Sequence, residues 1–409
     1  MLRPVTRFSV SLTVAAALVA CGAHAPRSQT QASSSGAAAT ATTTTKPPPP
    51  IVAPEQLQPG KYPTAPHAVP ATAGTAAAGT LLDAQRLAGY VAGPWAVDPA
   101  LTQAIVTPAV LLDKAELLGQ LGPESIAQAA ARHNFVDGFA STRNSADKVI
   151  LLNALLQFAG PDDAKQAAAE MNTAATDTAV KGNVPTAVAI VGHPETLASS
   201  YEVEAGGKQR ASVRAFTPHG SLVLMQLAQD PGGPGAANTL VAKAIDAQLP
   251  KLEGFVPADT RALTDVPVDP SGLLAVTLLS PSNSPTKNAE YSADAALHFQ
   301  MDPVASAKTF KDNGITKMTM GLTNVFQTAD PWDAVSLVNK FAAEVGADAQ
   351  PADAVPGLPL SKCASIAQGK QFYCVAPAGN FAIEGYGKDL QDTHEQVAAQ
   401  YILLTAPKR

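Results

Sequence analysis

Apolar and polar positions from residue 81 onward form short runs that occur in two similar series. Stretches headed by Pro123 and by Pro303 each predict a helix of about three turns, since proline is favoured in a first helical turn. Residues 317–326 alternate apolar and polar side chains, which predicts one half-buried strand. The corresponding apolar run at 148–158 fits a helix or a strand by periodicity, and the correspondence favours a strand.

The second part of each series also has the same order of elements. Acidic residues follow each predicted strand and begin a helix, over 161–171 and over 330–345, because carboxylates stabilise the first turn of a helix. Each series then has a hairpin of two strands and a closing helix with one apolar stripe, in which the polar Gln248 is expected to be tolerated. The hairpin strands are expected at 210–215 and 221–227, and at 371–376 and 380–386.

This order predicts an α+β fold of two tandem, internally duplicated units at 81–252 and 268–405, with a connection at 253–267. Each unit is expected to be roughly α-β-α-β-β-α, with helices packed on a small, mostly antiparallel sheet. Residues 86–94 also align without gaps to 273–281, which extends the repeat toward the start of each unit. The alternative is a chance recurrence of common turn and helix-start patterns.

Residues 1–20 have the pattern of a bacterial secretory signal peptide. Two arginines precede an apolar run over 8–19, and small residues then lead to Cys21. This ending resembles a lipobox, the processing motif of bacterial lipoproteins. The resemblance implies cleavage before Cys21 and a diacylglycerol on its sulfur. The alternative is an ordinary signal peptide that is cut after Ala20 or Ala25.

Residues 21–60 are predicted to be a disordered tether that lifts the body away from the membrane. Over 22–50 the chain is almost entirely Ala, Ser, Thr, Gln and Pro. Such a segment cannot bury enough apolar surface to offset the entropy cost of ordering it. The Thr- and Pro-rich part also suits O-glycosylation, although a bare linker has the same composition.

Composition and charge narrow the class of protein. The 409 residues are 46% hydrophobic and 15% charged, which suits a folded body and not a mostly disordered chain. The net charge is -6 and the sequence lacks a basic run, which argues against nucleic-acid binding through phosphates. Beyond residue 20 the sequence lacks a long apolar stretch, which excludes a polytopic membrane protein.

Three short segments carry a family resemblance. They are QRLA at 85–88, VDPAL at 97–101 and VAAQYILL at 397–404. With the lipobox and the tether, they make the chain similar to a group of uncharacterised mycobacterial and related actinobacterial lipoproteins of similar length. That family is built on a domain of unknown function. The resemblance therefore implies residence in the cell envelope and little about chemistry.

Cys363 and Cys374 are the cysteines that are left once Cys21 is assigned to the lipid anchor. An exported protein meets an oxidising environment, so we expect a disulfide between them. The alternative is two free buried thiols. Two cysteines without neighbouring histidines give too few ligands for zinc, so no metal site is expected.

The catalytic motifs in the sequence are incomplete. His394-Glu395 begins like a zinc-protease motif, but alanine stands at 398 where the second histidine belongs. Neither the G-x-S-x-G pattern of a nucleophile elbow nor a phosphate-binding loop occurs in the sequence. The adjacent acids Asp162 and Asp163 suit helix capping better than acid–base catalysis. We therefore expect no catalytic or cofactor-binding residue.

These observations predict a lipoprotein anchored through Cys21 on the outer face of the cytoplasmic membrane, within the cell envelope. Its expected role is binding or structural, and not enzymatic. The expected ligand is an envelope small molecule, lipid or glycan, held in a cleft between the two units. One alternative is an envelope hydrolase, which would bring Ser or Cys, His and acidic side chains together in one pocket. Another is a surface adhesin that uses the tether as a stalk.

Overall fold

The structure is a computed structural model that describes residues 47–205 and 208–406. The chain divides after Pro47 into two compact units, and all elements below belong to the second unit. The predicted signal peptide, Cys21 and most of the predicted tether lie outside the described residues. Among the helices of the described ranges, none combines the length and the hydropathy that crossing a membrane requires.

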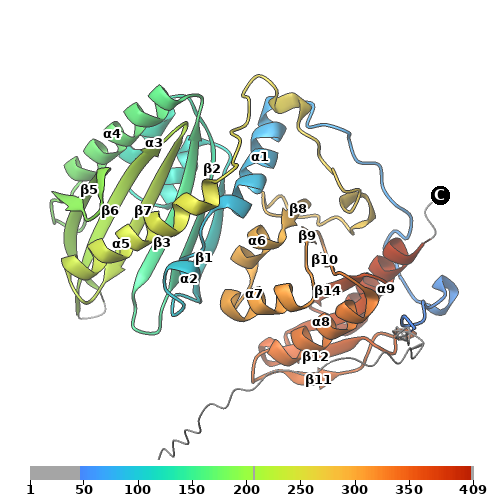
Figure 1. Ribbon diagram of the computed structural model, residues 1–409. Coiled ribbons are helices and arrows are strands. Elements are labelled where there is room, and N and C mark those ends of the chain that lie inside the picture. The colour runs from blue at the N-terminus through green and yellow to red at the C-terminus, as the bar shows by residue number, and fades with distance from the viewer. Residues whose placement is uncertain (1–46, 206–207, 407–409) are drawn as a thin grey trace, which may run out of the picture. The chain divides into compact units, whose positions relative to one another are not determined.

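The first half of this unit contains a seven-stranded antiparallel sheet in the order β1-β2-β3-β7-β6-β5-β4. Helices α3 (Glu124–Ala131) and α4 (Pro161–Asp177) cover one face, and α5 (Pro234–Gln248) covers the other (Figure 1). Because both faces are covered, strand β3 is buried along nearly its whole length. The strands are β1 Gln103–Leu112, β2 Phe135–Asn144, β3 Ile150–Phe158, β4 Thr186–Ile190, β5 His193–Ala205, β6 Lys208–His219 and β7 Leu222–Asp230.

The second half contains another seven-stranded antiparallel sheet. Its order, β8-β9-β10-β14-β13-β12-β11, repeats the order of the first sheet strand for strand. The predicted duplication is therefore confirmed by the strand order. The strands are β8 Ala289–Ser292, β9 Lys317–Met320, β10 Asn324–Gln327, β11 Gln350–Ala352, β12 Lys362–Ile366, β13 Gln371–Ala378 and β14 Phe381–Gly387.

The helices occupy equivalent places in the two halves. Helix α7 follows β8 as α3 follows β1, α8 follows β10 as α4 follows β3, and α9 follows β14 as α5 follows β7. The bounds are α7 Pro303–Asp312, α8 Pro331–Glu344, α9 Leu390–Thr405, α1 Ala76–Leu87, α2 Pro94–Val97 and α6 Ala293–Ala296. The short 3₁₀ helices are η1 Pro54–Gln56, η2 Ala88–Tyr90, η3 Ala115–Gln120, η4 Leu249–Leu252, η5 Leu263–Asp265, η6 Leu274–Val276, η7 Leu297–Phe299 and η8 Ala367–Gly369.

The predicted single strand over 317–326 is wrong, because the chain turns at Gly321 and returns as a second strand. The N–H of Gly321 donates to the carbonyl of Thr323 at 2.9 Å and closes this turn. A side chain cannot be placed at 321, since a Cβ there would lie 2.1 Å from the carbonyl oxygen of Leu278. The α-β-α-β-β-α order was also too short. It missed the outer strands, among them β5, whose buried positions include the polar Thr196 and Ser199.

A buried arginine joins the two halves. Arg143 in β2 donates hydrogen bonds to the carbonyls of Thr102 at 3.3 Å, His298 at 2.8 Å and Gln300 at 2.9 Å. The Nδ1 atom of His298 lies 2.8 Å from the hydroxyl of Ser141. An apolar cluster that contains Phe139 of the first half and Tyr291 of the second also extends across this junction.

Cys363 and Cys374 form the predicted disulfide. They face each other directly across the neighbouring strands β12 and β13, so the bond joins two strands of the second sheet. Part of the range predicted as a tether also packs against this half. Leu57 is buried, and the N–H of Val52 donates to the hydroxyl of Tyr401 in α9 at 2.9 Å. Residues 52–57 therefore form part of the folded body.

Candidate functional site

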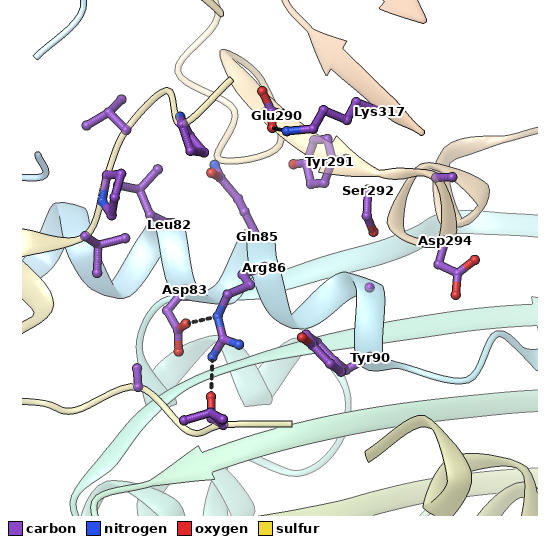
Figure 2. A pocket seen from close by; sticks show the side chains of 18 of the residues that line it. Leu82, Asp83, Gln85, Arg86, Tyr90, Glu290, Tyr291, Ser292, Asp294 and Lys317 are labelled. Carbon is purple, nitrogen blue, oxygen red and sulfur yellow. Dashed lines mark hydrogen bonds and ion pairs between the residues drawn. The ribbon is translucent and has the colours of Figure 1, made fainter. Parts of the chain in front are cut away.

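A cavity of about 950 Å³ lies between α1, the connecting segment and strand β8, and we call it the α1–β8 pocket. Figure 2 shows its lining side chains: Gln85 points from α1 toward Glu290 and Lys317 of the second half, whereas Asp83 and Arg86 leave the other side of the helix. The pocket therefore occupies the place of the cleft that was expected between the two units.

Helix α1 forms a charged wall of this pocket. Arg86 Nε donates to Asp83 Oδ1 at 2.6 Å, one turn earlier on the helix. The same guanidinium donates to the carbonyl of Val256 at 3.1 Å. It also lies over the rings of Tyr90 and Phe255, at 5.6 and 5.0 Å from their centroids. These contacts fix Arg86 against the wall and connect α1 to the segment that joins the two halves.

A coupled pair of buried carboxyl groups, Asp83 and Asp137, lies beside this arginine. Burial raises the pKa of Asp137 well above its ordinary value, and the charge of Asp83 and a hydrogen bond between the two groups raise it further. Asp137 therefore keeps its proton to a higher pH than an ordinary aspartate does, while Asp83 pairs with Arg86 and accepts from Gln157 Nε2 at 3.2 Å. Because both carboxyl groups are buried and Asp83 is already paired with Arg86, they support the wall and are not available for acid–base chemistry on a ligand.

The opposite wall comes from the second half, where charged groups are again paired. Lys317 Nζ lies 2.6 Å from Glu290 Oε1. Asp294, at the start of α6, lies 2.5 Å from Lys251 Nζ. Ser292 caps α6 by accepting from the N–H of Ala295 at 3.2 Å. The walls therefore present polar groups whose charges are already balanced by neighbours.

The residues that line the α1–β8 pocket include neither histidine nor cysteine. Within that lining, the combination of nucleophile, histidine and acid expected of a hydrolase is therefore not met. The walls instead offer carboxylate, guanidinium, amide and hydroxyl groups beside apolar side chains such as Leu82 and Val268. Such walls can hydrogen-bond a polar ligand at several points and contact its apolar faces.

The cysteines approach a histidine in the structure. The ligand atoms of Cys363, Cys374 and His394 all lie within 4.8 Å of one another. Both sulfurs are bonded to each other, however, so they lack the thiolate form that binds a metal. His394 Nε2 lies 2.9 Å from the carbonyl oxygen of Asp353. This group is therefore a disulfide packed beside a histidine. Cys21, the predicted lipidation site, lies outside the described residues.

The acids at the start of α4 differ from the predicted cap. Asp162 and Asp163 lie in the first turn, but Gly160 holds the cap position and no side chain caps α4 there. Asp163 instead accepts a hydrogen bond from Asn134 Nδ2 at 3.0 Å, which ties α4 to the loop before β2. Their role is structural, through the helix dipole and this contact.

Sequence reasoning expected a cleft between the units but did not identify the residues that line it, because its walls come from segments far apart in the chain. The pairing of Asp83 with Arg86 was readable from their spacing of one helical turn. The coupling of Asp83 to Asp137 was not readable, because it depends on how α1 packs against strand β2.

Comparisons with known proteins identify two family domains. The model of the DUF7373 N-terminal domain of unknown function matches residues 70–268, and the C-terminal model matches residues 271–406. No curated protein matches the chain.

Two solved structures show low similarity to the chain. The extracellular domain of PknH from Mycobacterium tuberculosis is 14% identical, with 38% of this chain and 91% of that chain covered and a TM-score of 0.27. DynU16, a protein of the dynemicin biosynthetic locus, is 8% identical, with 73% and 96% covered and a TM-score of 0.12.

Proposed function

The chain belongs to the DUF7373 family, whose function is unknown, and we propose that it is a lipid-anchored binding protein of the cell envelope. Its ligand is a neutral, hydroxyl-rich molecule, namely a glycan, that enters the α1–β8 pocket. The anchor and the ligand rest on separate observations and are tested separately.

The anchor is supported by the sequence before Cys21, where a basic start and an apolar run end in small residues. A diacylglycerol on Cys21 buries two acyl chains in the bilayer, and two chains suffice for stable attachment. The protein from its native host should therefore partition into detergent. Cys21→Ala should remain unprocessed or be released from the membrane. A mature N-terminus at any other residue would contradict the anchor.

The observation that carries the ligand class is the pairing of charges in both walls of the pocket. Asp83 is paired with Arg86, and Glu290 is paired with Lys317. A charged ligand would have to compete with these pairs, whereas hydroxyl groups can donate to the carboxylate of Glu290 and accept from Arg86 and Lys317 while both pairs persist. A cavity of about 950 Å³ also has room for several sugar rings.

Filling the pocket tests the ligand proposal. Ala262 lines the pocket and is exposed, so Ala262→Trp should occupy the cavity without disturbing the core. The control is Ala169→Trp, at an exposed position of α4 outside the pocket. Neutral oligosaccharides released from the host cell wall should bind the wild type and the control with the same affinity. They should bind Ala262→Trp at least about tenfold more weakly. Equal binding by all three proteins would exclude this pocket.

The hydrolase alternative is tested in the same mixtures. It needs an accessible nucleophile beside a titratable base, whereas Asp83 and Asp137 of this region are both buried. The oligosaccharides should therefore be recovered intact after long incubation with the protein. Shortened products that disappear with Ala262→Trp would show that the pocket is catalytic.

A further inference from the structure

A second cavity of about 630 Å³ lies in the other half of the protein, between the second sheet and helices α7 and α8. We call it the Glu384 cavity. Its walls are mostly apolar, which is typical of sites for small molecules. The apolar wall consists of Phe299, Met318, Met320, Phe341, Val345 and Ile366.

Glu384 of strand β14 lies in the lining of this cavity with only 7% of its surface exposed. Tyr373 donates to Glu384 Oε1 at 2.7 Å, and Asn324 Nδ2 donates to Glu384 Oε2 at 3.2 Å. Both bonds stabilise a carboxylate, because each partner donates. None of the ion pairs among the described residues includes Glu384. A buried carboxylate without a cation is costly, so its presence needs an explanation.

The duplicated fold shows that this glutamate is not required by the architecture. Counting from the two hairpin turns makes Glu384 equivalent to Met225 of β7. Their cross-strand neighbours, Asn324 and Ala154, are equivalent by the same count. In the first half, Met225 is fully buried in the apolar cluster under α3 and α4. The second half thus has two polar side chains beside a cavity where the first half has a packed core.

The surroundings of the cavity add negative charge. Asp302 and Glu344 both line it, whereas its lining contains no lysine, arginine or histidine. Cations act on these acids only from outside the lining: Arg143 on Asp302, Lys340 on Glu344, and Lys287 on Glu384. Burial lowers the pKa of Lys287, and the charge of Glu384 raises it in part. Lys287 does not line the cavity and forms no ion pair with Glu384 among the described contacts. A cation inside the cavity would therefore meet a favourable potential.

We propose that the Glu384 cavity binds an amphiphilic organic amine, with its apolar body against the walls and its protonated amino group at the carboxylate of Glu384. The amino group can also donate to Asn324 Oδ1, a buried acceptor without a partner in the structure. A primary or secondary amine fits better than a quaternary ammonium, because only the former carries N–H donors. The exposed Met301 and half-exposed Tyr386 at the cavity are then contacts for the part of the ligand nearest solvent.

Titration calorimetry with the full chain tests this proposal. Simple surfactants are titrated into the protein at concentrations below their critical micelle concentrations. n-Decylamine should bind, n-decyltrimethylammonium should bind more weakly, and n-decyl sulfate should not bind. Glu384→Gln should weaken n-decylamine binding by roughly 30-fold or more, as expected for loss of a buried charge pair. Glu116→Gln, at an exposed glutamate of η3, is the matched control and should bind as the wild type.

Equal binding of n-decyl sulfate and n-decylamine, or unchanged binding by Glu384→Gln, would overturn the proposal. If Glu384→Gln does not fold, Ala305→Trp serves instead, because Ala305 lines the cavity from an exposed position of α7. Ala262→Trp blocks the other pocket and should leave n-decylamine binding unchanged. The amine proposal and the glycan proposal therefore stand or fall separately.

Discussion

Gln248 and Gln400 make the same three hydrogen bonds at equivalent places of the two halves. Gln248 is buried in α5, where its Oε1 accepts from the N–H of Ala92 at 2.9 Å and from Asn153 Nδ2 at 3.0 Å. Its Nε2 donates to the carbonyl of Tyr90 at 2.7 Å. One side-chain amide thus binds the backbone of the segment after α1 and a strand of the sheet.

In the second half, Gln400 of α9 repeats this arrangement. Its Oε1 accepts from the N–H of Leu278 at 2.8 Å and from the hydroxyl of Thr323 at 2.7 Å. Its Nε2 donates to the carbonyl of Val276 at 2.7 Å. Each closing helix is therefore fixed to its own half by a buried glutamine, in addition to its apolar stripe.

Replacing either glutamine by alanine should strongly destabilise the protein. Each substitution leaves a buried N–H and a partly buried carbonyl without their partner, which should lower the free energy of unfolding by about 2–4 kcal/mol. Urea unfolding of Gln248→Ala and Gln400→Ala measures this loss. Gln166→Ala, at an exposed position of α4, is the control and should change stability little. Losses equal to that of the control would show that the apolar stripe alone holds the closing helices.

The same glutamines show how far the sequence could predict the fold. The Pro and Gly residues of Pro218-His219-Gly220 and Pro377-Ala378-Gly379 are strong turn signals in the sequence. The two predicted hairpins are found at these turns. The gap-free alignment of 86–94 with 273–281 is off by one residue. It places Tyr90 opposite residue 277, whereas Tyr90 and Val276 accept the equivalent hydrogen bonds from Gln248 and Gln400. That register depends on a long-range hydrogen bond, which leaves no local pattern.

The candidate sites were less predictable than the fold. Glu384 lies in an apolar strand whose pattern indicates only a buried segment. Its partner Asn324 is sixty residues away along the chain and becomes a neighbour only through the pairing of β10 with β14. The disulfide was predictable, because assigning Cys21 to the expected lipid anchor leaves two cysteines and therefore one pairing.

His298 should make the protein less stable in acid. Burial, and then the positive charges of Lys251 and Arg143, lower the pKa of His298 to about 3 from its ordinary value of 6.5. Below about pH 6.5 this histidine therefore binds a proton in the unfolded chain but not in the folded protein. The free energy of unfolding is therefore unaffected by this group above that pH and decreases as the pH falls toward 3.

His298→Gln removes this titrating group. In this range it should reduce the slope of the unfolding free energy against pH by up to about 1.4 kcal/mol per pH unit. His219→Gln is the control, because His219 is exposed at the end of β6. Urea unfolding between these pH values measures the slopes. A slope unchanged by His298→Gln would mean that another group causes the acid sensitivity.

Glu384 should have the opposite effect on stability. Burial raises its pKa, whereas hydrogen bonds from Tyr373, Asn324 and Tyr386 oppose the rise only in part. The unfolded chain releases this proton at a lower pH than the folded protein, so stability falls as the pH rises above the ordinary pKa of glutamate. Glu384→Gln should therefore be more stable than the wild type at about pH 7.5 and similar to it at about pH 4. Thermal unfolding at both values measures this, and a variant less stable than the wild type at the higher pH would argue for a structural role of the carboxylate.

The first half indicates how the disulfide can be removed without disturbing the sheet. The hairpin count makes Cys374 equivalent to Ala215, and the cross-strand partners make Cys363 equivalent to Ala198. Cys363→Ala with Cys374→Ala therefore copies a pair that the fold already contains. The double variant should fold and lose roughly 3 kcal/mol in the chain-entropy model. Urea unfolding with and without reductant measures the loss, and a reductant effect that persists in the variant would point to another cause.

Tyr401 should hold the segment before the first helix against the second half. Its ring is 3% exposed in the cluster that also contains Leu57, and its hydroxyl accepts the hydrogen bond from the N–H of Val52. Tyr401→Ala removes a large buried ring and should cost about 3–5 kcal/mol of unfolding free energy. Tyr401→Phe keeps the ring and should cost only about 1 kcal/mol, from the lost hydrogen bond. The two variants separate packing from hydrogen bonding. Urea unfolding measures the stability lost with the ring, and limited proteolysis at residues 50–57 measures how firmly the segment is attached. Cleavage there should be faster in Tyr401→Phe than in the wild type, and equal rates would show that Leu57 and its neighbours hold the segment without the hydroxyl.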